Sequence, residues 1–154
     1  MISNKAMIDD GVTLGKNVSV WEGSKIRSGV VIGDNTVIGM GVYIGPNVTI
    51  GSNCKIQNLA QIYDPTIIGD GVFVGPGVIL TNDKHPSAVN QDGSVKTSSD
   101  WQPVGVVLED HCSIGAGAIC VAPVVIGKSA LVAAGAVVTR DVKPNQTVVG
   151  IPAR

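Results

Sequence analysis

An aliphatic side chain recurs at every sixth position along most of the chain. The first run begins at Ile8 and ends at Leu80, and the register returns at Leu108 and continues to Val138. An α-helix, with its period of 3.6 residues, does not produce such a run. The members of the two runs are Ile8, Leu14, Val20, Ile26, Ile32, Ile38, Ile44, Ile50, Ile56, Ile62, Ile68, Val74 and Leu80, then Leu108, Ile114, Cys120, Ile126, Val132 and Val138.

The other positions of this six-residue unit are also regular. A small or β-branched residue follows four positions after each aliphatic one, as at Val12 and Ser24. Gly is frequent one position after it, and Asn or Gly three positions after it, as at Asn17 and Gly29. Gly and Asn tolerate the left-handed backbone of tight turns. Each unit therefore predicts a short strand with an inward aliphatic residue, followed by a tight turn.

Three such units would close a triangular coil of about eighteen residues, and stacked coils would form parallel sheets. The number of units predicts about six coils around a dry aliphatic interior. The predicted fold is all-β, a parallel β-helix forming a single domain over residues 1–154.

Residues 83–102 leave the repeat. Their sequence, DKHPSAVNQDGSVKTSSDWQ, is polar and contains Pro, Asn, Gly and Ser, so it should run outside the β-helix. Long loops on a regular solenoid are usually functional or disordered. Because the repeat resumes afterwards, we expect an ordered loop, with a neighbouring subunit as one surface for it to reach.

Composition and charge limit the partners. The formal net charge of −1 gives no electrostatic reason to expect nucleic acid or an anionic membrane surface. No apolar run approaches the roughly 20 residues that span a bilayer, and the segment MISNKAMIDDGV lacks the apolar stretch of a secretory signal. We therefore expect a cytoplasmic protein.

The three cysteines follow no CxxC spacing. Their odd number argues against a disulfide framework and a zinc site, so we expect no metal and a reducing compartment. Cys54 and Cys112 take the small inward position and Cys120 the aliphatic one. All three should be buried and inert.

The pattern [Ile/Leu/Val]-Gly-x-x-small-x resembles the hexapeptide-repeat acyltransferases. The resemblance covers nearly the whole chain and implies a left-handed coil, a homotrimer and acyl transfer from coenzyme A (CoA). The left hand rests on the resemblance alone, because ordinary parallel crossovers are right-handed.

A narrower resemblance runs from Lys55 to Ala118, through the segments KIQNLAQIYD, VFVGPGVILTND, DGSVKTSSDW and SIGAGA. These segments are similar to N-acetyltransferases that act on nucleotide-linked 3-amino sugars in lipopolysaccharide biosynthesis. The similarity implies acetyl-CoA as co-substrate and a dTDP- or UDP-linked amino sugar as acceptor.

Catalytic candidates lie at the start of the loop. His85 carries an imidazole that can take a proton from the attacking amine, although a solvated loop histidine is the simpler interpretation. The resemblance implies that Asn82 hydrogen-bonds the sugar near the amine. Three roles are open for Asp83. Its carboxylate polarises the imidazole of His85, or binds the ammonium form of the substrate amine, or Asp83 is simply the left-handed turn residue of its unit.

Substrate contacts are expected at Gln57, Asn58 and Tyr63, in units where Leu59 and Pro65 replace the usual Asn or Gly. Departures from a repeat often mark sites, and the resemblance assigns this stretch to the nucleotide sugar. Local variation of the turns is the alternative.

The Gly- and Ala-rich coils near the C-terminus imply the CoA site. By resemblance, pantetheine meets backbone N–H groups around Gly117 and Ala134, and one N–H near Gly117 stabilises the oxyanion. Four basic residues are candidate ligands of the CoA phosphates: Lys128, Arg140, Lys143 and Arg154.

Three other functions stay open at this point. The same scaffold could acetylate a hydroxyl of a sugar or another small acceptor, which demands a true base. A γ-type carbonic anhydrase needs three zinc-binding histidines, and the chain has only His85 and His111. His111 occupies a turn position and is interpreted as structural. A purely structural β-helix is the remaining alternative.

Overall fold

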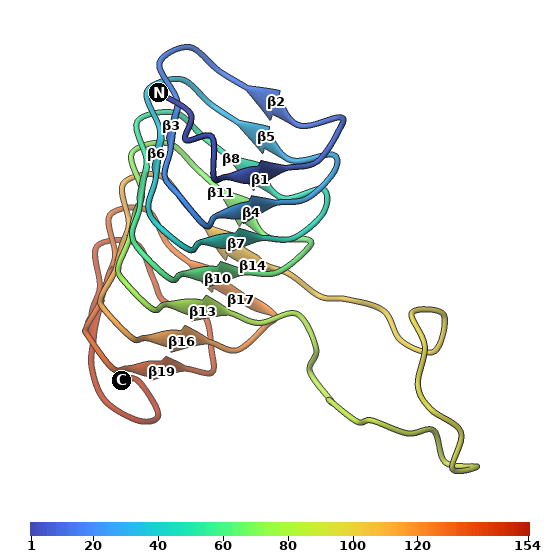
Figure 1. The fold of residues 1–154 in the computed structure, drawn as a ribbon. Coiled ribbons are helices and arrows are strands. Elements are labelled where there is room, and N and C mark those ends of the chain that lie inside the picture. The colour runs from blue at the N-terminus through green and yellow to red at the C-terminus, as the bar shows by residue number, and fades with distance from the viewer.

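The computed structural model describes residues 1–154 as a parallel β-solenoid with twenty short strands and no helix (Figure 1). Strands pair in parallel with the strand one coil further along. Met7 pairs with Lys25 and Ile8 with Ile26, a step of eighteen residues. The structure therefore confirms the predicted coil of three six-residue units.

The strands form three sheets, one on each side of the coil. Sheet I contains β1 (Met7–Ile8), β4 (Lys25–Ile26), β7 (Tyr43–Ile44), β10 (Gln61–Ile62), β13 (Ile79–Leu80), β16 (Ile119–Cys120) and β19 (Val137–Val138). Sheet II contains β2 (Thr13–Leu14), β5 (Val31–Ile32), β8 (Thr49–Ile50), β11 (Ile67–Ile68), β14 (Val106–Leu108) and β17 (Val124–Ile126). Sheet III contains β3 (Ser19–Val20), β6 (Val37–Ile38), β9 (Lys55–Ile56), β12 (Phe73–Val74), β15 (Ser113–Ile114), β18 (Leu131–Val132) and β20 (Thr147–Val148).

The solenoid has about eight turns, so the prediction of about six was too low. Sheet III has seven strands, and a bridge between Ile2 and Val20 adds one more level at its N-terminal end. A bridge between Ile126 and Val142 extends sheet II in the same way at the other end. Ile2 lies six residues before Ile8 and extends the run, which was counted only from Ile8, whereas Val142 lies outside the run.

The interior is the stack of aliphatic residues that the repeat predicts. Thirty-five buried residues form one core cluster, and its largest side chains, from Ile26 to Ile126, are almost completely buried. Burying an Ile or Leu side chain contributes about 1.5–3 kcal/mol. The few aromatic residues stay outside: Trp21 and Phe73 are exposed.

The turns use the left-handed backbone that Asn and Gly tolerate. Asn17, Asn35 and Asn53 have φ near +60°, and their side chains form a ladder in which each Nδ2 donates to the next Oδ1 over 3.1 Å. His111 has φ +61°, so its prediction as a turn residue is confirmed. Leu59, with φ +63°, adopts the same conformation without the side-chain chemistry that normally favours it.

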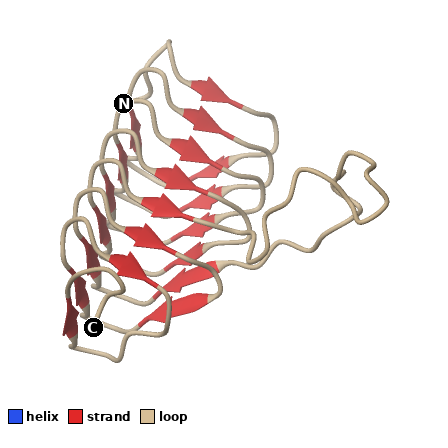
Figure 2. Ribbon diagram, turned by 90° about the horizontal axis from the view of Figure 1, so that it is seen from below, coloured by secondary structure: helices blue, strands red, loops and turns tan.

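The long loop occupies the connection between β13 and β14 and projects far from the body of the coil (Figures 1 and 2). At its base, the N–H of Val104 donates to the carbonyl oxygen of Asn82 over 2.9 Å. Inside it, Val89 and Val95 form an antiparallel bridge. Beyond the loop, β14 pairs with β11 and the coil continues in register. No helix in the structure is long and apolar enough to cross a membrane.

Candidate active site

Three edges separate the sheets, and two of them carry the candidate catalytic and substrate-binding residues. The I–II edge follows the strands of sheet I and includes Tyr63 and Asn82. The III–I edge follows the strands of sheet III and is formed by the pairs Glu22–Gly23, Met40–Gly41, Asn58–Leu59, Pro76–Gly77, Ala116–Gly117 and Ala134–Gly135.

Asn82 lies on the I–II edge, where the chain leaves β13 to enter the loop. Its backbone is held by Val104, and its half-buried side chain donates through Nδ2 to Oδ1 of Asp64 over 3.5 Å, a long hydrogen bond. Tyr63, one residue before Asp64, packs against Tyr43 with ring centroids 5.4 Å apart. The base of the loop therefore offers an amide, a carboxylate and an aromatic ring at one point.

His85 and Asp83 are close in the loop, but the carboxylate does not reach the imidazole. Oδ1 of Asp83 accepts the backbone N–H of His85 over 2.8 Å, which is a turn contact. The imidazole of His85 is exposed and forms no hydrogen bond within the chain. Asp83 therefore orders the backbone at the loop entrance.

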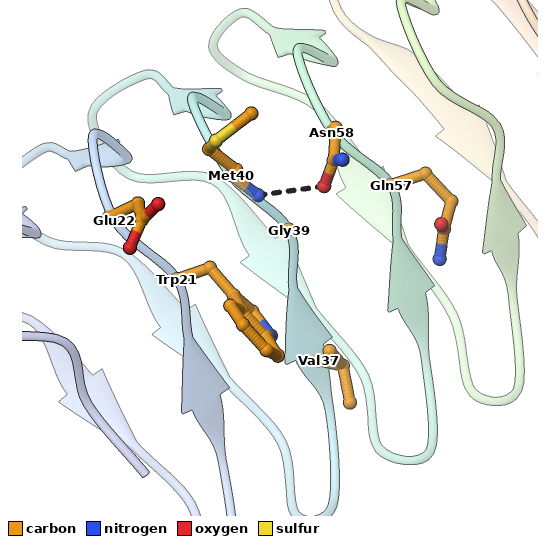
Figure 3. Close-up of a pocket in the computed structure, with 7 residues that line it drawn as sticks. All are labelled: Trp21, Glu22, Val37, Gly39, Met40, Gln57 and Asn58. Carbon is orange, nitrogen blue, oxygen red and sulfur yellow. Dashed lines mark hydrogen bonds between the residues drawn. The ribbon is translucent and has the colours of Figure 1, made fainter.

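Gln57 and Asn58 lie on the III–I edge, so one chain does not bring them together with Asn82. Sheet I stands between the two edges. Oδ1 of Asn58 accepts the N–H of Met40 over 2.9 Å (Figure 3), while the side chain of Gln57 forms no hydrogen bond within the chain. The predicted substrate residues thus separate into two groups, with Tyr63 beside Asn82.

Backbone donors are free along the III–I edge, at Glu22 and Asn58 in its N-terminal half and at two alanines in its C-terminal half. The N–H of Gly117 donates to the carbonyl of Pro76 over 2.9 Å and is not available to a ligand. The N–H groups of Ala116 and Ala134, both exposed residues, have no acceptor within the chain.

On the II–III edge, the backbone N–H groups at the equivalent positions are hydrogen-bonded by side chains. There, carboxylates from the next coil accept the equivalent N–H groups, as Asp34 does for Lys16 over 2.7 Å and Asp110 for Asp70 over 2.9 Å. Alanine side chains cannot accept a hydrogen bond. The donors at Ala116 and Ala134 are therefore open to an external acceptor.

The four predicted phosphate ligands occupy two separate places. Arg140 and Arg154 line a hollow of about 220 Å³ at the C-terminal end of the coil, together with Gln146. Lys128 and Lys143 lie on the II–III edge, where their N–H groups donate to Glu109 and Gln146 side chains. All four basic residues are exposed.

The cysteines are buried, as the repeat predicts, and are reduced. Burial raises the pKa of the Cys112 and Cys120 thiols to about 12 and also raises the pKa of Cys54. A thiol with so high a pKa supplies almost no thiolate near neutrality, so none of the three is suited to be a nucleophile.

The largest hollow of the molecule, about 420 Å³, was not predicted from the sequence. It lies on the outer side of sheet III beside the III–I edge, and Trp21, Met40 and Gln57 are among its lining residues (Figure 3). The sequence did contain an indication of this hollow. Trp21 occupies the position one after the aliphatic residue, where the repeat usually has Gly.

Comparison with known proteins identifies the repeat. Residues 29–62 and 47–82 match the family described as "Bacterial transferase hexapeptide (six repeats)", and residues 105–140 match "Hexapeptide repeat of succinyl-transferase". A 2,3,4,5-tetrahydropyridine-2,6-dicarboxylate N-acetyltransferase of Staphylococcus aureus is 49% identical over 49 residues, which are 32% of this chain. The match covers only 20% of that relative's length.

Solved structures share the coil. WeeI from Acinetobacter baumannii AYE is 25% identical, with a TM-score of 0.63 over 97% of this chain and 57% of that one. The acetyltransferase domain of PglB from Neisseria gonorrhoeae FA1090, solved in complex with acetyl coenzyme A, shares the fold at 18% identity, with a TM-score of 0.51 over 99% of this chain and 55% of that one. The two family models together match residues 29–82 and 105–140, more than half of the chain, and the eighteen-residue coil agrees with them, so the chain belongs to the hexapeptide-repeat acyltransferase family.

Proposed function

We propose that the protein transfers the acetyl group of acetyl-CoA to the amino group of a nucleotide-linked amino sugar, with dTDP- and UDP-linked sugars as the expected acceptors. We propose further that it does so as a homotrimer. Family membership supports acyl transfer, and the name of the S. aureus relative supports an acetyl group and a nitrogen acceptor. The acceptor itself is inferred from the residues between Lys55 and Ala118.

The observation that carries this proposal is the pair of free N–H groups at Ala116 and Ala134. Both belong to exposed residues with small side chains, so a thin pantetheine arm can lie against the backbone. Its amide carbonyls and the thioester carbonyl are the acceptors that these donors lack. A fixed N–H that faces the developing oxyanion is typically worth about 10²–10³-fold in rate. In this account, Ala116 takes the role expected near Gly117.

The positions along the coil support a site between subunits. Gly77 and Asn82 flank β13, so they lie on the same coil at opposite edges of sheet I. If the three-fold axis of the trimer runs parallel to the axis of the solenoid, each coil lies at the same height in all three subunits. The loop base of one subunit would then face the III–I edge of the next, uniting Asn82 with Ala116 and Ala134.

The proposed reaction is a direct transfer. The amine nitrogen attacks the thioester carbonyl, a C–N bond forms, and the oxyanion accepts a hydrogen bond from Ala116. The C–S bond then breaks and the CoA thiolate leaves, while the proton of the amine passes to His85 or to that thiolate. Asn82 orients the amine through its side-chain amide.

The surroundings of His85 favour an amine over a hydroxyl acceptor. A hydroxyl must lose its proton to become a good nucleophile, so it needs a well-oriented base. In this chain no carboxylate holds the imidazole of His85, because Asp83 binds the backbone N–H instead. An amine that is already neutral needs less assistance.

Phosphate binding is assigned in the proposal to Arg140 and Arg154. Guanidinium groups bind phosphate through paired N–H donors, and these two residues face one hollow at the C-terminal end of the coil. Arg140 follows β19 on the I–II edge, the edge that the proposed cleft uses.

The proposal is tested by supplying acetyl-CoA with a panel of dTDP- and UDP-linked amino sugars and measuring release of free thiol. The expected result is thiol release with at least one amino sugar and none with its hydroxyl counterpart. The buried cysteines should not interfere, because their raised pKa values keep them as thiols. No release across the panel would contradict the amino-sugar assignment.

Replacement of His85 separates the two acceptor chemistries. His85→Asn should lower the rate without abolishing it if the acceptor is an amine, and should abolish it if the acceptor is a hydroxyl. The matched control is His111→Asn, because Asn tolerates the left-handed φ of His111. This control lies outside the proposed site and should retain the full rate.

A further inference from the structure

The hollow beside Trp21 is built by a departure from the repeat. Along the outer side of sheet III, the position after each strand is Trp21, Gly39, Gln57, Gly75 and Gly115 in successive coils. Small residues therefore alternate with two large ones at the N-terminal end. Adjacent coils are about 4.8 Å apart, so Trp21 and Gln57 stand about 10 Å apart with Gly39 between them.

Gly39 keeps the floor of this hollow open. A Cβ at Gly39 would lie 2.6 Å from Oδ1 of Asn58, so no side chain fits there while Asn58 binds the N–H of Met40. The ring of Trp21 leans from β3 toward β6 and ends beside Val37 (Figure 3). Trp21 is nevertheless 47% exposed, and the hollow of about 420 Å³ falls in the range of about 300–1,000 Å³ usual for small-molecule sites.

The polar groups around the indole are not used by the protein. The carboxylate of Glu22 and the amide of Gln57 have no hydrogen-bond partner within the chain, and Nδ2 of Asn58 donates to nothing. Together the hollow offers an aromatic face, two amides that match the edge of a planar heterocycle, and a carboxylate that accepts hydroxyl groups. A carboxylate on ribose hydroxyls is a common arrangement in nucleotide sites.

We propose that this hollow binds a nucleoside, with the base stacked on Trp21, the base edge on Gln57 and Asn58, and the pentose hydroxyls on Glu22. The negative charge of Glu22 keeps the attached phosphates outside the hollow. This nucleoside site adds to the proposed function and rests on it, because the nucleoside is taken to belong to one of the two substrates of the proposed reaction.

Two molecules of the proposed reaction carry a nucleoside: the nucleotide-linked acceptor and CoA. The hollow shares the III–I edge with the free donors: Asn58, on its near side, is two coils or about 10 Å from Ala116, and Trp21 is four coils or about 19 Å away. The diphosphate and sugar, or the pantetheine arm, attached to a nucleoside at Trp21 would span this distance to a reaction centre at Ala116. The test distinguishes the two sources.

The chain has only two tryptophans, which makes the test direct. In Trp101→Phe, Trp21 is the sole tryptophan and reports on the hollow by fluorescence. This variant is titrated with UDP, dTDP, ADP and CoA, and with inorganic pyrophosphate as the control without a base. Calorimetry on Trp21→Ala and Glu22→Gln supplies affinities that do not depend on fluorescence.

The expected result is saturable quenching of Trp21 by at least one nucleoside diphosphate and none by pyrophosphate. UDP or dTDP as the tighter ligand identifies the acceptor as the source, whereas ADP and CoA identify the cofactor and would contradict the assignment of its phosphates to Arg140 and Arg154. Trp21→Ala should weaken binding about 10- to 100-fold, the usual contribution of base stacking, and Glu22→Gln about 5- to 10-fold.

The site is overturned if no nucleotide perturbs Trp21, or if Trp21→Ala binds as tightly as the wild type. These outcomes are separate from failure of the proposed function. Thiol release without a response at Trp21 contradicts the nucleoside site alone, and a response at Trp21 without thiol release contradicts acetyl transfer alone.

Discussion

Two buried threonines occupy the small inward position but differ in what their hydroxyl groups do. Oγ1 of Thr36 donates to the carbonyl of Gly51 over 2.9 Å and accepts the N–H of Cys54 over 3.1 Å. Oγ1 of Thr66 is buried without a partner. A buried polar group without a hydrogen bond is a net cost, so the two residues have opposite effects on stability.

Exchange of each threonine for valine tests this difference. Thr66 lies between Val48 and Val106 in adjacent coils, so valine fits the column. We expect Thr66→Val to raise the free energy of unfolding by about 1 kcal/mol, and Thr36→Val to lower it by about 1–2 kcal/mol because Cys54 loses its acceptor.

The measurement is urea denaturation of both variants at one protein concentration, since oligomers are more stable when concentrated. Equal destabilisation by the two exchanges would show that the Thr66 hydroxyl is satisfied and would contradict this account.

At the same scale, the sequence could not reveal which backbone donors are free. It predicted contacts around Gly117 and Ala134, but whether an N–H is occupied depends on the residue one coil away. Pro76 supplies an acceptor for Gly117, whereas Ala134 has no side-chain acceptor to offer Ala116. Such pairings require the stacking of coils to be known first.

At the scale of elements, two short carboxylate turns stabilise the loop in addition to the bridge between Val89 and Val95. The carboxylate of Asp92 accepts the N–H of Ser94 over 2.9 Å, and that of Asp100 accepts the N–H of Thr97 over 2.7 Å. Hydrogen bonds from the Ser94 side chain and backbone lower the pKa of Asp92, and those from the Thr97 backbone and side chain lower the pKa of Asp100. The coil body depends instead on its aliphatic core.

These lowered pKa values predict selective loss of loop structure in acid. A lowered folded-state pKa stabilises the loop at all pH values above the ordinary value of 3.8, and the stabilisation is lost as pH falls through the lower folded value. We expect hydrogen-exchange protection of the Ser94 and Thr97 amides to persist from pH 7 to about pH 4 and to disappear below it.

Amides of the coil, such as Gly51, which donates to Ile68 over 2.8 Å, should stay protected under the same conditions. Asp92→Asn with Asp100→Asn is the control, because amides do not titrate in this range. Simultaneous loss of protection in loop and coil would contradict the prediction.

The elements themselves were predictable from the sequence, because one six-residue pattern fixes the strand, the turn and the inward side chain together. The period also predicted that residues eighteen apart share an edge. The same rule applies to the site: Gln57 and Asn82 differ by twenty-five positions, which is one coil plus about one six-residue side. Their separation on two edges was therefore implicit in the repeat. The number of coils was underestimated because the run was counted only from Ile8 and the C-terminal level at Val142 departs from the pattern.

At the scale of the whole molecule, the proposed site combines residues that one chain holds on two different edges. Asn82 and the loop lie on the I–II edge, while Ala116, Ala134 and the hollow at Trp21 lie on the III–I edge. Sheet I separates these edges, so the proposed site combines two copies side by side. We propose that each site takes one edge from each of two neighbouring subunits.

Mixing two inactive variants tests this claim most directly. Asn82→Ala removes the side chain that is proposed to orient the amine, and Ala116→Pro removes the free N–H. Pro76 occupies the position equivalent to Ala116 one coil earlier, so the backbone there accepts proline. Each variant alone should lose about 100-fold or more in acetyl transfer. In equal mixtures refolded together, about one site in four combines two intact edges if subunits associate at random around a three-fold axis. We predict recovery of about a quarter of the wild-type rate, whereas a mixture no more active than its separate components would contradict a site shared between subunits.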